Sequence, residues 1–186
     1  MEQRFFTSET EWEQWLSHHV DLEAGIQIKF AKKDSGIQSL HYPEALDVAL
    51  CYGWIDGRSN SLDETYYLQK FTPRRPKSTW SQRNVKKAEE LIKAGRMKAP
   101  GFAAIEAAKA DGRWEAAYAS AKNITVPSEL LSVFKERPNL KRVFEALSSA
   151  NRYAVLWRLA TARTEKTKQA RLAKIIGMLE SGETFH

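Results

Sequence analysis

The sequence predicts an α+β fold in which a small N-terminal α/β lobe with an antiparallel hairpin is followed by a helical C-terminal lobe. Three observations predict it. Apolar and polar residues alternate over residues 26–31, two extended runs flank a polar loop at residues 59–64, and apolar residues recur at helical spacing almost throughout the chain beyond Pro100. We therefore divide the chain into an N-terminal lobe, residues 1–99, and a C-terminal lobe, residues 100–186.

The first lobe is predicted to begin with a short strand at residues 4–6 and a helix. Ser8 and Glu11 have the capping-box spacing, in which each side chain satisfies backbone amides at the start of a helix. Gly25 is placed to end this segment before the strand at residues 26–31. The two apolar faces that we expect to pack together are Trp12, Trp15 and Leu16 on the helix and Ile26, Ile28 and Phe30 on the strand.

Further turn signals divide the rest of the chain. Pro43 suits a helix start, and that helix is expected to end at Gly53. Residues 54–58 and 65–71 read as the hairpin, and Pro73 and Pro76 then break the pattern before a helix from Ser81 to residue 97. The helices expected in the second lobe span residues 102–110, 128–135, 140–147, 150–162 and 165–180.

Composition excludes several classes of protein. Of the 186 residues, 42% are hydrophobic and 28% are charged, which is typical of a globular chain and not of a disordered or fibrous one. The longest apolar runs are too short for a membrane span, and Cys51 is the single cysteine. We expect a cytoplasmic protein without membrane insertion, without a disulfide and without a structural metal or other cofactor; the sequence does not indicate its oligomeric state.

Charge is distributed in zones along the chain. The net charge is −7 over residues 1–69, +8 over residues 70–98 and +5 over residues 99–186. A basic zone beside an acidic one either binds a polyanion or pairs with the acidic zone of the same chain. We favour internal pairing, because most charged runs end as solvated or paired surfaces.

The densest group of chemically active side chains comes from two segments, residues 42–56 and 70–81. Arg74, Arg75 and Lys77 lie between or beside prolines that restrict the backbone, an arrangement suited to binding phosphate or carboxylate groups. Two readings remain open, a ligand site and a loop clamped by salt bridges to nearby carboxylates. The candidate ligand-binding residues are Tyr42, Glu44, Asp47, Trp54, Asp56, Phe71, Arg74, Arg75, Lys77 and Trp80, with Phe71 and Trp80 as stacking faces and Glu44, Asp47 and Asp56 as the carboxylates of the clamp.

The sequence lacks the familiar catalytic motifs, including phosphate-binding glycine loops, the serine nucleophile elbow and the HExxH zinc motif. Its histidines, His18, His19, His41 and His186, have no ligand spacing, so no metal site is predicted. Cys51 lies on a helix rich in alanine and leucine, where a cysteine is usually a small buried hydrophobe. The catalytic residues are therefore unknown, and an enzyme is the less favoured class.

Several runs of sequence resemble the YdeI/OmpD-associated (bacteriocin-protection) family. They are YPEALD at residues 42–47, CYGWIDG at 51–57 and FTPRRPKSTWS at 71–81, and the likeness continues through LIKAGRM at 91–97, AAKADGRW at 107–114 and LSSANRY at 147–153. The turn before the last helix, ARTEKTK at 162–168, departs from the Lys-Lys-Pro-Glu-Thr-Arg form of the family. The resemblance implies a bacterial protein linked to bacteriocin tolerance or an outer-membrane porin, and it supplies no catalytic residue.

Three functional hypotheses follow. The leading one is a non-enzymatic protein of this family, linked to bacteriocin or stress tolerance, that binds a small anion or a protein partner through the segments above. The second is nucleic-acid binding through the basic zone of residues 70–98, with Trp80 as a stacking face. The third is an unrecognised hydrolase that uses Glu44 or Asp56.

Overall fold

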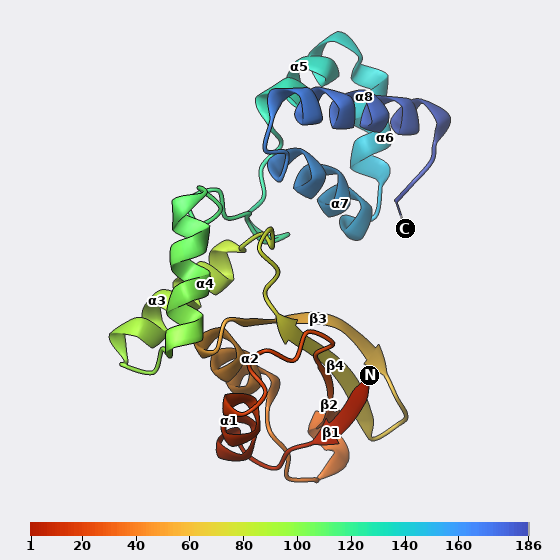
Figure 1. Cartoon of the computed structure of the whole chain (residues 1–186). Helices are drawn as coiled ribbons and strands as arrows, with labels where there is room; N and C mark the ends of the chain where they lie inside the picture. The colour runs from red at the N-terminus through yellow and green to blue at the C-terminus, as the bar shows by residue number, and fades with distance from the viewer. Residues whose placement is uncertain (186) are drawn as a thin grey trace. The chain divides into compact units, whose positions relative to one another are not determined.

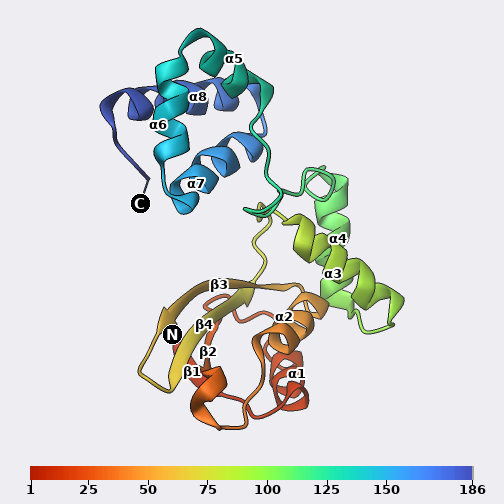
Figure 2. The same cartoon turned by 180° about the vertical axis from the view of Figure 1, so that it is seen from behind.

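The computed structural model describes residues 1–185, so His186, which was not expected to bind a metal, lies outside the described residues. The chain divides into two compact units (Figures 1 and 2). The first consists of Met1–Ser78 and Asn84–Glu115, and the second of Thr79–Arg83 and the chain from Ala116 onward. The changeover near residue 115 falls later than residue 99, where the sequence analysis divides the chain. The α+β fold class is confirmed, because a four-stranded sheet is followed by helices.

The first unit contains the sheet. Its strands are β1 (Glu2–Phe5), β2 (Ile26–Ala31), β3 (Trp54–Ser61) and β4 (Tyr66–Pro73), in the order β1-β2-β4-β3. β1 and β2 are parallel, and the other two pairings are antiparallel. The predicted hairpin is confirmed as β3 and β4, with an irregular register between Asp56 and Ser59. The hairpin docks on β2 through β4, which leaves β1 and β3 as the edges.

The first unit also contains helices. They are α1 (Glu9–Ser17), α2 (Tyr42–Cys51), α3 (Gln82–Lys93) and α4 (Ala99–Ala110), with a short 3₁₀ turn η1 (Lys33–Ser35). Both views show α1 and α2 on the same face of the sheet (Figures 1 and 2). α2 begins at Tyr42, one residue before the predicted Pro43, because the Glu44 carboxylate accepts a hydrogen bond from the His41 amide at 3.0 Å and caps the helix there.

The core of the first unit lies between α1 and the sheet. The expectation that Trp12, Trp15, Leu16, Ile26, Ile28 and Phe30 are buried is confirmed. The Trp12 ring lies 5.8 Å from the Phe71 ring and 6.2 Å from the Trp54 ring, measured between centroids. Its Nε1 atom donates to the Ala45 carbonyl at 3.1 Å, and Trp54 Nε1 donates to the Val20 carbonyl at 2.9 Å. The aromatic cluster thus joins both helices and the strands.

The predicted cap at the start of α1 forms with one change of partner. The Ser8 hydroxyl accepts a hydrogen bond from the Glu11 amide at 3.3 Å, as expected. The Glu11 carboxylate accepts its main hydrogen bond from the amide of Thr7, at 2.7 Å, one residue before the expected amide of Ser8. These hydrogen bonds lower the pKa of Glu11, since they favour its charged form.

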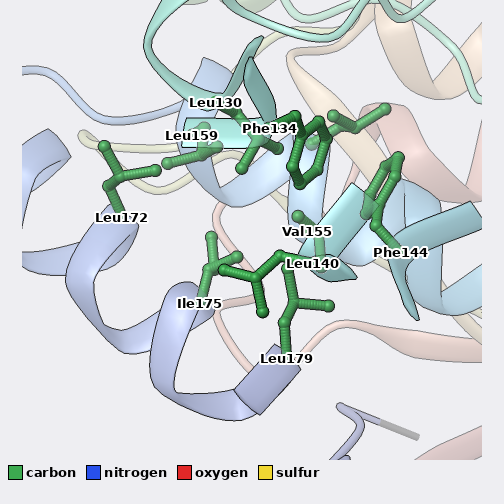
Figure 3. Packing of buried hydrophobic residues seen from close by; sticks show 10 residues of the cluster. Leu130, Phe134, Leu140, Phe144, Val155, Leu159, Leu172, Ile175 and Leu179 are labelled. Atoms are coloured by element: carbon green, nitrogen blue, oxygen red, sulfur yellow. The ribbon is translucent and has the colours of Figure 1, made fainter. Parts of the chain in front are cut away.

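The second unit is helical. Its helices are α5 (Ser128–Glu136), α6 (Pro138–Ala146), α7 (Ser149–Ala160) and α8 (Glu165–Ser181), close to the predicted ranges. Leucine and phenylalanine side chains from all four helices meet in its core (Figure 3). The chain after α8 returns to α7, where the Phe185 amide donates to Asn151 Oδ1 at 3.1 Å and the Arg158 guanidinium lies 3.7 Å from the Phe185 ring centroid. No helix within residues 1–185 is long and apolar enough to cross a membrane.

Candidate functional site

The three carboxylates expected to clamp the basic loop make other contacts. Glu44 caps α2, as described above. The Asp47 carboxylate forms an ion pair with Lys87 of α3, and Asp56 Oδ2 accepts a hydrogen bond from the Tyr42 hydroxyl at 2.9 Å. Tyr42 and Asp56 are therefore brought together, and Asp47 serves to hold α3 against α2.

Three of the four candidate aromatic residues, Trp54, Phe71 and Trp80, are buried, whereas Tyr42 is partly exposed. Phe71 and Trp54 have no exposed surface and belong to the aromatic cluster around Trp12. Trp80 is 1% exposed and belongs to the second unit, where its carbonyl accepts a hydrogen bond from the Tyr118 amide at 3.0 Å. Each of the three buried rings packs in the interior of its unit, which explains why aromatic residues at these positions read as stacking faces in the sequence: burial and stacking favour the same residue types.

Arg74 and Arg75 lie at the end of β4, where hydrogen bonds fix the backbone before and after the turn. The Arg74 amide donates to the Gly53 carbonyl at 2.9 Å. The Arg75 amide donates to the Ser78 hydroxyl at 3.0 Å, and the Ser78 amide donates to the Arg75 carbonyl at 2.9 Å. Buried Arg113 donates from Nη1 to the Ser78 carbonyl at 2.9 Å. A tight turn that is fixed from outside thus carries the two arginines.

A pocket of about 600 Å³ opens beside this turn. Three cations line it, Lys70, Arg74 and Arg75, together with two carboxylates, Asp21 and Glu23. Its remaining wall consists of Val20, Ala24, Thr72, Pro73 and Pro76. We call this the basic pocket. Lys77 of the same loop is exposed and does not line it.

Sequence reasoning missed Asp21 and Glu23 as members of the site. It included Lys70 at the start of the basic segment without naming it as a candidate residue. The loop that carries the two acids reaches β4 because Gly25 has a positive φ of +67° and no side chain: a Cβ there would lie 2.2 Å from the Phe71 carbonyl oxygen. The signal in the sequence was Gly25 itself, whose expected role was only to end a segment. The spacing of residues did not indicate that Gly25 would lie against β4.

A second pocket, of about 770 Å³, contains two of the other candidate residues. Tyr42 and Glu44 line it, with His41, Lys32 and Tyr67 around them. Burial raises the pKa of Tyr67, so its hydroxyl stays neutral at physiological pH. Seven of the ten candidate residues thus lie in two pockets, the aromatic core and the second unit. The other three, Asp47, Asp56 and Lys77, line neither pocket.

The basic zone of residues 70–98 pairs in part with the acidic N-terminal zone. Besides Lys87 with Asp47, Arg96 pairs with Glu9, and Lys98 Nζ lies 3.1 Å from Glu13 Oε1. The hydrogen bond and charge of Glu13 raise the pKa of Lys98. Internal pairing, which the charge zones predicted, is observed for these three cations.

Cys51 is buried at the end of α2, and burial raises the pKa of its thiol to about 11. The thiolate is the nucleophilic form of cysteine, so the thiol is unreactive near neutral pH. Within residues 1–185, no three His, Cys, Asp or Glu side chains are grouped so as to hold a metal ion.

Two family models match the chain. Residues 4–104, more than half of the chain, match a domain of unknown function, DUF8412. Residues 123–182 match the family described as Bacteriocin-protection, YdeI or OmpD-Associated (OmdA). The chain belongs to the DUF8412 family, and its residues 123–182 are similar to the YdeI/OmpD-associated family. The search of the curated proteins and that of the solved structures gave no match.

The two matches separate what the sequence resemblance had joined. The YdeI/OmpD-associated resemblance is confirmed, and the OmdA match covers α5 to α8. The runs at residues 42–57 and 71–81, on which the resemblance mainly rested, lie within the DUF8412 match instead. The basic pocket belongs to this DUF8412 region, and the link to bacteriocin protection comes from the OmdA region.

Proposed function

We propose that this YdeI/OmpD-associated protein acts in bacteriocin or stress tolerance as a binding protein, and that its basic pocket takes a small anion bearing phosphate or carboxylate groups. We place this activity in the cytoplasm, where a single cysteine stays reduced. A cytoplasmic protein does not meet a bacteriocin at the cell surface, so protection is an indirect effect of the bound ligand.

The observation that carries the proposal is the convergence of Lys70, Arg74 and Arg75 on one pocket. Guanidinium groups bind carboxylate and phosphate through paired hydrogen bonds, and an ammonium group adds a further charge. The backbone hydrogen bonds of Arg74 and Arg75 and the adjacent prolines hold the loop before a ligand arrives. Less conformational entropy is then lost on binding, which favours affinity.

Asp21 and Glu23 limit what the pocket accepts. The three cations exceed the two carboxylates by one charge, so the pocket favours an anion without strongly concentrating negative charge. A ligand that carries an anionic group and a hydrogen-bond donor satisfies both sides of the pocket, because carboxylates accept hydrogen bonds.

The experiment compares the anion response of the parent with that of two variants. Thermal melts are recorded over a titration of inorganic phosphate, citrate and a panel of anionic metabolites. A ligand at 100 times its dissociation constant adds about 2.7 kcal/mol to the free energy of unfolding and raises the melting temperature. Arg75→Gln and Lys70→Gln each remove a charged hydrogen bond worth about 1.5–3 kcal/mol, so affinity should fall roughly 10- to 150-fold.

Lys77→Gln is the matched control, because Lys77 is an exposed cation of the same loop outside the pocket. It should leave the anion response unchanged. The double variant Arg74→Ala/Arg75→Ala separates the ligand site from a structural clamp. A large fall in its melting temperature, with no anion stabilising the parent, would reject the pocket as a ligand site.

A further inference from the structure

The strand registers define which residues lie on the face of the sheet opposite α1 and α2. Residues paired across neighbouring strands point to the same face, and the face alternates along each strand. Ile26 pairs with Phe71, and both are buried in the core. The intervening pairs therefore face outward. They are Gln3 with Gln27, Phe5 with Lys29, Lys29 with Leu68, Gln27 with Lys70, Ala31 with Tyr66, Asn60 with Leu68, and Ile55 with Thr72. We call this the outer face.

The outer face is basic. Among its strand residues just named, Lys29 and Lys70 are charged and none is acidic. Lys70 extends over Gly57, where an added Cβ would lie 3.4 Å from the Lys70 side chain, so the glycine leaves room for it. Asp63, in the turn between β3 and β4, accepts hydrogen bonds from the Thr65 and Tyr66 amides at 2.8 and 2.7 Å, and these lower its pKa. Its carboxylate is therefore charged and offsets part of the positive charge near Lys29. The two lysines still leave the face with a net positive charge, which complements a negatively charged partner.

Aromatic rings accompany these cations. Phe5 is 39% exposed, and its ring meets the half-buried Tyr66 ring edge to face with centroids 6.1 Å apart. Lys29 Nζ lies 3.7 Å from the Tyr66 ring centroid. Solvated aromatic rings beside cations form a surface on which bases stack while phosphates are neutralised. Phe5 is the more accessible ring for stacking, because the Lys29 ammonium covers one side of the Tyr66 ring.

The outer face runs into the basic pocket. Along β4, Tyr66, Lys70 and Thr72 alternate on this face, and Lys70, Thr72 and Arg74 line the pocket at its end. Arg74 lies eight positions after Tyr66, which corresponds to about 27 Å of extended chain. A single mononucleotide is too short for this distance, whereas a strand of several nucleotides spans it.

We propose that the outer face binds single-stranded nucleic acid, with a base stacked on Phe5 and the phosphate chain following Lys29 and Lys70 to the basic pocket. This inference rests on the proposed function only in assigning a phosphate to the pocket. A single strand fits better than a duplex because its unpaired bases are open to stacking on side chains. The surface shares only the start of the zone of residues 70–98, from Lys70 to the basic pocket. Lys87, Arg96 and Lys98, later in that zone, pair with carboxylates.

The test is fluorescence polarisation with a labelled 15-nucleotide oligothymidylate over a series of salt concentrations. Phe5→Ala, an exposed substitution, should weaken binding about 5- to 150-fold through the lost base stack. Lys29→Gln should reduce the slope of log affinity against log salt by about 0.7, the value for one phosphate contact to a single strand. Gln27→Glu places a negative charge between the two lysines and should weaken binding more than Lys29→Gln does.

Lys86→Gln is the control, because Lys86 has a side chain 79% exposed on α3, within the zone of residues 70–98. Equal loss of affinity in Lys86→Gln and Lys29→Gln would overturn the assignment to the outer face, as would a parent that does not bind the oligonucleotide. Inorganic phosphate melts of Phe5→Ala separate the two proposals. If phosphate stabilises the parent and Phe5→Ala equally while the oligonucleotide does not bind, the outer-face proposal fails and the pocket stands. If the oligonucleotide binds through Phe5 and no anion stabilises the parent, the pocket fails instead.

Discussion

Two stacked tryptophans of α1 provide a matched pair for testing how the core of the first unit is held. The Trp12 and Trp15 rings lie 5.5 Å apart, nearly parallel, and both are buried. Trp12 Nε1 donates to the Ala45 carbonyl. Trp15 Nε1 is buried without a hydrogen-bond partner among the described residues. The same substitution at the two positions therefore removes similar apolar volume and different polar interactions.

The expected costs differ in size. Trp→Phe removes about three ring atoms, worth roughly 2 kcal/mol of apolar burial at either position. At Trp12 the substitution also removes a hydrogen bond worth about 1 kcal/mol, for a total near 3 kcal/mol. At Trp15 it removes a buried unsatisfied N–H, which returns about 1–3 kcal/mol, so the net cost should be about 1 kcal/mol or less. Trp15→Ala, which empties the site, should still cost roughly 3–5 kcal/mol.

Urea denaturation followed by far-ultraviolet circular dichroism measures these differences, since a fluorescence probe would change with the tryptophan content. Each midpoint is converted to a free energy of unfolding with the parent slope. A Trp15→Phe variant that is destabilised as much as Trp12→Phe would refute the reasoning, because it would mean that the two indole N–H groups contribute equally.

Three further predictions concern the buried Cys51 and two helical glycines, one buried and one exposed. Burial raises the pKa of Cys51 to about 11, so its thiol should react slowly with thiol reagents at pH 8, and rapid labelling of the native protein would contradict this. Between pH 9 and 11 the unfolded thiol ionises and the folded one does not, so the parent should lose more stability than Cys51→Ala over this range. Gly101→Ala should destabilise by about 1–3 kcal/mol, since its Cβ would lie 2.3 Å from the Cys51 carbonyl oxygen and 2.4 Å from Met97 Sδ. Gly177→Ala in α8, with open space around it, should stabilise by about 0.5–1 kcal/mol in the same denaturation assay, and equal effects at both glycines would refute the packing argument.

Local sequence patterns predicted the elements well because their causes are local. The Ser8 cap, the alternation of Ile26, Ile28 and Phe30, and the helical spacing beyond Pro100 each act within a few residues, and each matches an observed element. The parallel pairing of β1 with β2 was not predicted. It depends on α1 returning the chain across the sheet, and no short pattern encodes this.

The candidate site was predicted less well because its partners are distant in the sequence. Asp47 and Lys87 lie 40 residues apart, and Arg96 and Glu9 lie 87 apart. Charge zoning predicted that such pairs form, and it did not identify which residues pair. Phe71 and Trp80 illustrate a second limit, since an aromatic residue beside cations reads alike whether it stacks on a ligand or fills a core.

The short segment Thr79–Arg83 has a consequence for dissecting this protein into modules. It lies within the DUF8412 match, yet it belongs to the second unit, where Ser81 pairs with Tyr118 and Trp80 is buried. The two family matches therefore do not coincide with the two compact units. An expressed fragment that begins at residue 116 would lack Trp80 and Ser81, the strand partner of Tyr118. A chimera joined between residues 104 and 123 would combine residues 79–83 of one protein with the helical unit of another. Independent production of the helical unit requires residues 79–83 to be supplied in trans or grafted onto its start.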